Sequence, residues 1–404
     1  MTDALYILTG IALLLLGGLI ITIISNKLKI SNVLLLIILG IGLRAIKYNG
    51  TPIIEFSSTF LLAISILALA MITFDGASRF KLKEVDQFSG DAVKVFLWFV
   101  FTNIILITIF TLILFFPNFS TEYIIISLMF AVMMAATDPA AIFSMMKGKV
   151  NKVIEVLEIE SIINTPFIVI IPFILLDFLK ATGSGQLFNS FIEQIVPFLQ
   201  QIIVGVGAGV VVGIIIFKAM RNVYHHQLSP LAIIVAALLA YVLAENLGGN
   251  GVLSVATMGL LFGNVYVKEK FFLKEFSSIF SNSLEILVFV MLGFLVEMSF
   301  TTDFFIKSIT LFFILVLARW FAITFALKGK DYDLKEKLFM TFNMPKGIAV
   351  AAVVFSLSMR SIEGLGVIID LVLIFMIYSL VLSTVTDLFA NRMIQLSSQA
   401  QKET

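Results

Sequence analysis

Uninterrupted apolar runs dominate this sequence, and each is about as long as the hydrocarbon core of a membrane is thick. A helix that crosses this core needs about 20 apolar residues, because each residue adds about 1.5 Å along the helix axis. Charge clusters and turn residues divide the sequence into about thirteen candidate spans, at 4–24, 32–48, 53–74, 92–116, 121–146, 152–179, 189–217, 228–246, 250–266, 277–298, 304–327, 337–358 and 364–390. Only 13% of the residues are charged, whereas a soluble domain has roughly a quarter, so lipid has to solvate most of the surface. We therefore predict an all-α polytopic membrane protein.

Several classes of function are excluded by what the sequence lacks. The absence of cysteine excludes disulfides, thiolate metal sites and cysteine nucleophiles. The net charge of +1 gives no electrostatic field that would attract nucleic acid. The two histidines, His225 and His226, are adjacent in a predicted loop, and no nucleophile has a base at a suitable spacing. We expect no enzyme activity and no cofactor.

Basic residues are distributed unevenly between the predicted loops. The loops after odd-numbered spans contain Lys27, Lys29, Arg79, Lys81, Lys83, Lys147, Lys149, Lys152, Lys218, Arg221, Lys268, Lys270, Lys274, Lys328, Lys330, Lys335 and Lys337. The loops after even-numbered spans contain little beyond Arg44, Lys47, Lys180 and Arg360. Because cytoplasmic loops carry the excess of lysine and arginine, we predict a cell-membrane protein with its N-terminus outside and its C-terminus in the cytoplasm.

An odd number of helices is what two inverted six-helix repeats and one linking helix would give. On this arrangement one transmembrane domain covers residues 1–391, and a short cytoplasmic tail covers 392–404. The first repeat covers about 4–179, the linking helix about 189–217 and the second repeat about 228–390.

Among the charged residues of the apolar spans, four stand out at mid-membrane depth, where each needs either a partner or a function. Asp138 follows Thr137 and precedes Pro139, and proline prevents a regular helix at that point. We expect an unwound segment here, with free carbonyl groups beside a carboxylate at membrane depth. Such breaks are tolerated where they line a cavity, and many secondary transporters bind ions at them. For Asp138 we favour a function over a structural role.

The other three charges lie on three different predicted spans. Glu160 shares a helix face with Asn164, four residues later. Arg319 lies deep in the eleventh span, and we favour a static ion pair between Arg319 and Glu160. Lys346 lies in a second proline- and glycine-broken segment, where it fits two roles, capping the broken helix end or competing with a cation.

These residues form a pattern that resembles the monovalent cation:proton antiporters of the NhaP/NHE branch over essentially the whole chain. The motifs that carry the resemblance are Thr137-Asp138-Pro139, Glu160-Ser161-Ile162-Ile163-Asn164-Thr165-Pro166, Leu317-Ala318-Arg319, Pro345-Lys346-Gly347 and the stretch from Ala244 to Asn264. The resemblance implies a homodimer in the bilayer, with a core bundle that moves against a dimerisation scaffold. It also implies broken helices that cross at mid-membrane, where cation and proton compete for carboxylates.

The resemblance assigns roles to the residues that match the family's motifs. It implies that Asp138, Thr137, Asn164, Thr165 and Ser161 bind the ion or proton, with a sodium site at Asp138 and Thr165. It also implies a structural or modulating ion pair of Glu160 with Arg319, and a charge at the helix break in Lys346.

Two positions depart from the family's pattern. Lys346 stands where arginine is usual, which keeps the charge but loses the planar fork. Thr165 stands where the family has its principal cation- and proton-carrying aspartate, and a threonine hydroxyl cannot carry the proton. With Asp138 and Glu160 negative and Arg319 and Lys346 positive, the set is neutral.

The leading hypothesis is a secondary-active transporter that exchanges Na⁺, K⁺ or Li⁺ for H⁺ by alternating access, with transport impaired or altered by Thr165. Three alternatives stay open, namely a conductive cation channel, a non-transporting paralogue and an engineered inactive variant.

Overall fold

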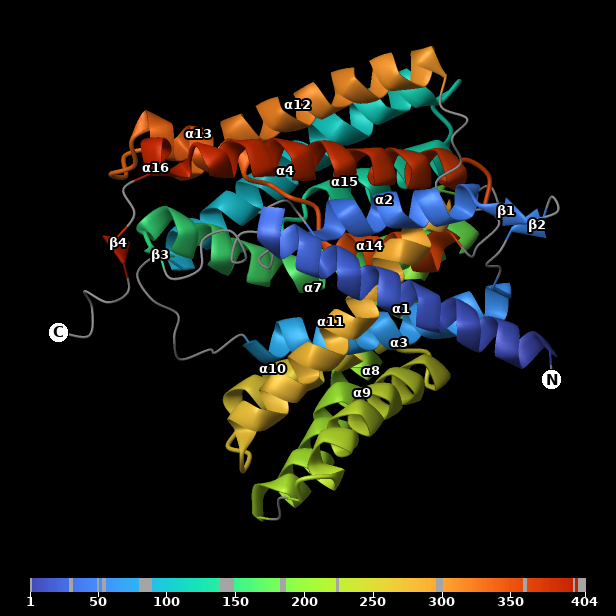
Figure 1. Cartoon of the computed structure of the whole chain (residues 1–404). Coiled ribbons are helices and arrows are strands. Elements are labelled where there is room, and N and C mark those ends of the chain that lie inside the picture. Colours follow the sequence, from blue (N-terminus) through green and yellow to red (C-terminus); the bar gives the residue numbers. More distant parts are fainter. Residues whose placement is uncertain are drawn as a thin grey trace. The chain divides into compact units, whose positions relative to one another are not determined.

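The structure is a computed structural model of the whole chain, and it describes residues 2–28, 32–48, 51–52, 56–79, 89–138, 149–181, 187–222, 225–295, 301–358, 362–394 and 397–398. The described part is helical apart from turns, short connections and two antiparallel pairs of two-residue strands. The strands are β1 (Lys47–Tyr48) with β2 (Thr51–Pro52), and β3 (Lys149–Val150) with β4 (Ser397–Ser398). The all-α prediction is therefore confirmed (Figure 1).

The chain divides into two compact units, which are described separately. Unit 1 comprises Met1–Ser58, Asp86–Asn164 and Ile286–Thr404, and unit 2 comprises Thr59–Val85 and Thr165–Glu285. The helices of unit 1 are α1 (Thr2–Leu28), α2 (Asn32–Ala45), α4 (Ser89–Phe115), α5 (Thr121–Met134), α12 (Thr302–Ala326), α13 (Leu334–Phe342), α14 (Ile348–Ser358), α15 (Leu365–Leu388) and α16 (Ala390–Met393), with the first part of α7 (Lys152–Ala181) and the end of α11 (Lys270–Leu295). Unit 2 contains nearly all of α3 (Ser58–Arg79), the rest of α7 and α11, and α8 (Leu187–Asn222), α9 (Leu228–Asn246) and α10 (Gly251–Asn264).

Eight of the described helices are long and apolar enough to cross a membrane, and five further apolar helical segments of 10–17 residues are shorter. Many predicted bounds lie within a few residues of the observed ones, and α9 begins and ends where the sequence predicts. Two predicted spans are not single helices. The segment 121–146 is helical only to Met134 within its described part, and 337–358 divides into α13 and α14. The number thirteen stays a prediction.

Aromatic side chains hold the helices of unit 1 together. In Figure 1, α12 runs alongside α4, and α4 also packs on α5. Phe375 of α15 makes edge contacts with Phe130 of α5 and Phe312 of α12, at ring-centroid distances of 5.2 and 5.3 Å. Such edge-to-face pairs each contribute about 0.5–1.5 kcal/mol beyond the apolar area that they bury. Helix α15 also packs on α13 and α14, so α5 and the two helices that flank the break share this neighbour.

In unit 2, α8, α9 and α10 pack on one another. Gly209 of α8 lies so close to α10 that a Cβ atom at this position would be 2.2 Å from the carbonyl oxygen of Ser254. Small residues permit this close approach of two helix backbones, as in many membrane proteins.

Candidate functional site

Two non-helical segments of unit 1 lie against each other. Helix α5 ends at Met134, Ala135 is its C-cap residue, and residues 136–138 are not helical. Helix α13 ends at Phe342, and residues 343–347 are not helical before α14 begins at Ile348. The backbone N–H of Asp138 donates a hydrogen bond to the carbonyl oxygen of Pro345, at 2.9 Å. The sequence predicted both interruptions, and the structure shows that they touch. The residues from Pro139 to Gly148 lie outside the described part.

Lys346 is fully buried and caps the end of α5. Its Nζ atom donates to the carbonyl oxygens of Met134 and Ala136, at 2.8 and 2.7 Å. These carbonyls have lost the helical partners that α5 would have supplied had it continued. The backbone N–H of Lys346 donates to the hydroxyl of Ser379 on α15, at 3.1 Å. These hydrogen bonds have the geometry of a helix cap.

Asp138 is 4% exposed and lies directly against the second break. A Cβ atom added to Gly347 would be 2.0 Å from the Oδ2 atom of Asp138, so only glycine fits beside this carboxylate as it stands. Thr137, the preceding residue, accepts a hydrogen bond from the Nδ2 atom of Asn164 on α7, at 2.7 Å. The structure therefore brings Thr137, Asp138 and Asn164 together within unit 1.

Asn164 supplies a further oxygen to this region. Its side chain is fully buried, and its Oδ1 atom has no hydrogen-bond partner among the described residues. A buried amide oxygen without a donor is unusual, because leaving it unsatisfied costs about 1–3 kcal/mol. Carboxylate, amide and hydroxyl oxygens are the ligands that hard cations prefer. The chemistry of Asp138, Asn164 and Thr137 therefore suits a dehydrated monovalent cation.

Glu160 and Arg319 form a bidentate ion pair between α7 and α12. The Arg319 Nη1 and Nη2 atoms lie 2.5 and 2.6 Å from the two carboxylate oxygens of Glu160, and both side chains are fully buried. The guanidinium also lies over the ring of Phe99 on α4, with its Cζ atom 4.5 Å from the ring centroid. Two opposite charges with matched geometry neutralise each other here.

The remaining predicted site residues, Ser161 and Thr165, both lie on α7. The Ser161 hydroxyl donates to the backbone carbonyl of Glu158, at 2.7 Å, within its own helix. Thr165 follows Asn164 in α7, and its side chain lies outside the described part, as does that of Pro166.

Sequence reasoning missed three residues that shape the breaks. Asn103 of α4 is fully buried and donates to the carbonyl oxygen of Ala131 in the last turn of α5, at 3.1 Å. Ser379 receives the N–H of Lys346, and Gly347 makes room for Asp138. A polar side chain inside an apolar span was a signal for Asn103, but its partner is 28 residues away and the sequence does not reveal it.

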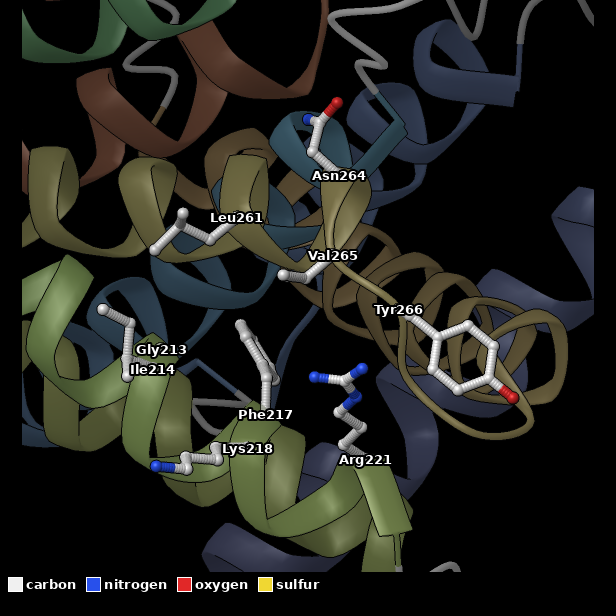
Figure 2. Close-up of a pocket in the computed structure, with 9 residues that line it drawn as sticks. All are labelled: Gly213, Ile214, Phe217, Lys218, Arg221, Leu261, Asn264, Val265 and Tyr266. Carbon is white, nitrogen blue, oxygen red and sulfur yellow. The ribbon is translucent and has the colours of Figure 1, made fainter.

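Unit 2 contains a separate cavity of about 340 Å³ between α8 and α10 (Figure 2). Its lining residues are Gly213, Ile214, Phe217, Lys218, Arg221, Leu261, Asn264, Val265 and Tyr266. The charged side chains in this lining are basic, which does not suit a cation. Among the described residues, no three histidine, cysteine, aspartate or glutamate side chains gather into a group that could hold a metal ion.

Comparison with known proteins gives one consistent result. The family model described as "Sodium/hydrogen exchanger, transmembrane" matches residues 11–388. The chain is 27% identical over 380 residues to Na(+)/H(+) antiporter 1 of Methanocaldococcus jannaschii, covering 88% of this chain and 83% of that relative. It is 26% identical over 330 residues to the K(+)/H(+) antiporter NhaP2 of a Shewanella species (strain ANA-3), which is 79% of this chain but 55% of that relative.

A solved structure of a similar protein has the same fold. The sodium proton antiporter MjNhaP1 from Methanocaldococcus jannaschii superposes with a TM-score of 0.76 at 22% identity, over 97% of this chain and 98% of that chain. The prediction of a multi-pass antiporter-type fold is thereby confirmed. Because the family model covers nearly all of the sequence, the resemblance seen in the motifs is confirmed as well. The chain belongs to the transmembrane sodium/hydrogen exchanger family.

Proposed function

We propose that this chain exchanges a monovalent cation for H⁺ across the cell membrane by alternating access, with Asp138 as the exchanging group. The observation that carries the proposal is the burial of the Asp138 carboxylate where two helix breaks touch. The two relatives above, named as Na(+)/H(+) and K(+)/H(+) antiporters, support it.

Competition for one carboxylate is enough to couple the two ions. An ionised carboxylate in a buried site can be neutralised by a proton or by a cation that has shed its water. The empty, charged form is costly to bury, so the site crosses between its two accessible states mainly when it is occupied. Exchange of cation for proton follows without a separate coupling device. Asp138, the Thr137 hydroxyl and the Asn164 Oδ1 atom are the groups that we assign to the cation.

Thr165 limits which groups of this chain can carry the proton. Threonine offers one neutral oxygen and does not titrate in the physiological range, so it can contribute to a sodium site but cannot carry a proton. The proton therefore has to be carried by another group, and Asp138 is the candidate at the breaks. Lys346 caps α5, and Glu160 pairs with Arg319. We therefore assign structural roles to Lys346 and to the Glu160–Arg319 pair.

For the membrane orientation and the assembly of the chain, we propose what the sequence predicts. We place the N-terminus outside and the C-terminus in the cytoplasm, because the basic loops alternate in that sense. We also propose a homodimer and two inverted repeats around the linking helix. A conductive channel is the second candidate, because the neutral Thr165 leaves one titrating group fewer and passive flow needs none.

Reconstitution of the full chain into liposomes tests the proposal. A pH-sensitive dye is enclosed, a gradient of Na⁺, K⁺ or Li⁺ is imposed, and the membrane potential is clamped. Exchange predicts a change of lumenal pH that follows the cation gradient at zero potential. A channel predicts cation flux that follows the potential and moves no protons, and a non-transporting chain predicts neither signal.

The variant Thr165→Asp tests the role assigned to the threonine. We expect the added carboxylate to raise proton-coupled Na⁺ or Li⁺ flux, by about tenfold or more if it supplies a second carrier. Equal flux in the two proteins would show that position 165 does not limit exchange.

A further inference from the structure

A carboxylate that the exchange site does not use lies in the last turn of α15. Asp387 precedes the final helical residue, Leu388, and its Oδ1 atom accepts a hydrogen bond from the Nδ2 atom of Asn343 at 2.6 Å. The Ser383 hydroxyl, one turn earlier on α15, donates to the Oδ1 atom of Asn343 at 2.7 Å. Asp387, Asn343 and Ser383 are called the Asp387 cluster. The cluster ties the end of α15 to the residue at which α13 stops.

The second oxygen of Asp387 is unsatisfied. Its Oδ2 atom is buried and has no hydrogen-bond partner among the described residues. Asn343 is fully buried and Ser383 is 2% exposed, and Asp387 itself is half-buried with its Oδ2 atom turned away from water. An ionised carboxylate in such a place is costly unless several donors or a positive charge face it. Among the described residues, the Asn343 amide is the donor that faces the Asp387 carboxylate.

Charged groups on the surrounding helices are engaged elsewhere or make no described bond to Asp387. The helices that pack on α15 are α5, α12, α13, α14 and α16. Their charged side chains are Glu122 on α5, Asp303, Lys307 and Arg319 on α12, Lys335, Glu336 and Lys337 on α13, and Arg392 on α16, while α14 has none. Arg319 pairs with Glu160, Lys307 with Asp303, and Glu336 with Lys152. In the described part of the chain, Asp387 forms no salt bridge.

The arrangement of donors and acceptors favours a proton over a metal cation as the ligand of Asp387. Asn343 turns its NH₂ group to the carboxylate, and its oxygen already accepts the Ser383 hydroxyl. The cluster therefore offers a cation the oxygens of one carboxylate and little else, whereas a dehydrated metal cation requires several oxygen ligands. A proton needs one oxygen, and the buried Oδ2 atom is free to take it.

We propose that Asp387 is a second proton-binding site of this chain, distinct from Asp138, and that Asn343 couples its protonation to the break at residues 343–347. A hydrogen bond to an ionised carboxylate is roughly twice as strong as one to the neutral acid. Protonation of Asp387 therefore loosens its hold on Asn343, two residues before the Pro345 carbonyl that receives the N–H of Asp138. The coupling to exchange rests on the proposed function, whereas proton binding by Asp387 does not.

Infrared spectroscopy of the purified full chain tests proton binding without any transport. A protonated carboxylic acid has its own C=O band, which disappears as the pH rises and the group ionises. We expect Asp387→Asn to remove one titrating component of this band. The matched control is Asp303→Asn, which changes an aspartate whose side chain is 70% exposed and should leave this component in place. An unchanged titrating band in Asp387→Asn would overturn the proposal.

If Asp387→Asn does not fold, a milder variant, Ser383→Ala, still tests proton binding by Asp387. Ser383→Ala retains the carboxylate but removes the hydroxyl that orients Asn343. We expect the pH at which the band is half lost to move by about half a unit or more, because the hydrogen bond to the ionised form changes. The same half-point in Ser383→Ala and in the unaltered chain would show that the cluster does not govern this proton.

Flux measurements test the coupling. Asparagine imitates the protonated acid, so Asp387→Asn should flatten the pH profile of exchange in the range where the band titrates, while Asp303→Asn keeps the profile. An Asp387→Asn protein that loses the band but keeps the profile would overturn the coupling to the break. If the unaltered chain shows no exchange at all, the proposed function fails, and the infrared result alone then decides whether Asp387 binds a proton.

Discussion

The Nζ atom of Lys346 donates to the carbonyl oxygens of Met134 and Ala136, so a side chain from one helix break caps the end of the other broken helix. A buried carbonyl without a donor costs about 1–3 kcal/mol. We therefore expect Lys346→Met to lower the free energy of unfolding by about 2–6 kcal/mol. The measurement is the midpoint of thermal unfolding in detergent. Lys307→Met is the control, because its exposed pair with Asp303 contributes about 0–1 kcal/mol. Equal midpoints for the two variants would contradict the capping role.

The ion pair between Glu160 and Arg319 predicts strong non-additivity. Removing one partner leaves the other charge buried and unpaired, so Glu160→Leu or Arg319→Met alone should cost about 3–5 kcal/mol of stability. The double substitution Glu160→Leu with Arg319→Met removes both charges and should recover much of that loss. Denaturation midpoints of the two single variants and the double variant form the test. Additive losses would mean that the two side chains do not act as a pair.

Gly347 predicts a specific defect in exchange. Because a Cβ atom would lie 2.0 Å from the Oδ2 atom of Asp138, Gly347→Ala has to displace the carboxylate or the break. We expect the rate of exchange to fall by about a hundredfold, since displacements of about 1 Å have this effect at reacting groups. Gly366→Ala is the control, because a Cβ atom there has no heavy atom within 4 Å and the residue is helical. Similar flux in both variants would mean that the carboxylate tolerates displacement.

Much of the fold follows from the sequence, because lipid allows so few alternatives. Each apolar run has to satisfy its backbone hydrogen bonds internally, so most runs become helices near their predicted bounds. The 228–246 run becomes α9 with the predicted limits. Helix α5 ends earlier than Pro139 requires, at Met134, because Asn103 and Lys346 satisfy carbonyls at its end. Those donors come from distant spans, and no local pattern predicts which carbonyls they reach.

The sequence identifies the charged residues of the candidate site but not the residues that surround them. Asp138, Glu160, Arg319 and Lys346 are conspicuous because charge is rare in apolar spans. The contact of Gly347 with Asp138 and the link from Asp387 to Asn343 depend on packing between segments far apart in the chain. Asp387 also lies at the end of its span, where an acidic residue is unremarkable.

Tyr332 predicts a stability change at alkaline pH. It lies in the connection between α12 and α13, and its hydroxyl donates to the Oδ2 atom of Asp91 at 3.3 Å. Burial first, and then the charge and the hydrogen bond of Asp91, raise the pKa of Tyr332 well above its usual value of 10.0. The unfolded chain therefore releases this proton at lower pH than the folded chain does.

From this difference the free energy of unfolding should fall as the pH rises above about 10. Tyr332→Phe removes the titrating group, so its thermal midpoint should fall less steeply over that range. The comparison is the difference between the two proteins, since other tyrosines and lysines titrate in both. Parallel curves above pH 10 would mean that Tyr332 titrates alike in the folded and unfolded chain.

The most direct test of the proposed function is cation-driven proton flux through the full chain with Asp138 or with asparagine at that position. Asparagine keeps the size and one oxygen of the side chain but cannot bind and release the proton. Folding of both proteins is checked by thermal unfolding before flux is compared at clamped zero potential. We predict that the unaltered chain changes lumenal pH when a Na⁺, K⁺ or Li⁺ gradient is imposed and that Asp138→Asn does not. Undiminished exchange in folded Asp138→Asn would contradict the assignment of Asp138 as the exchanging group.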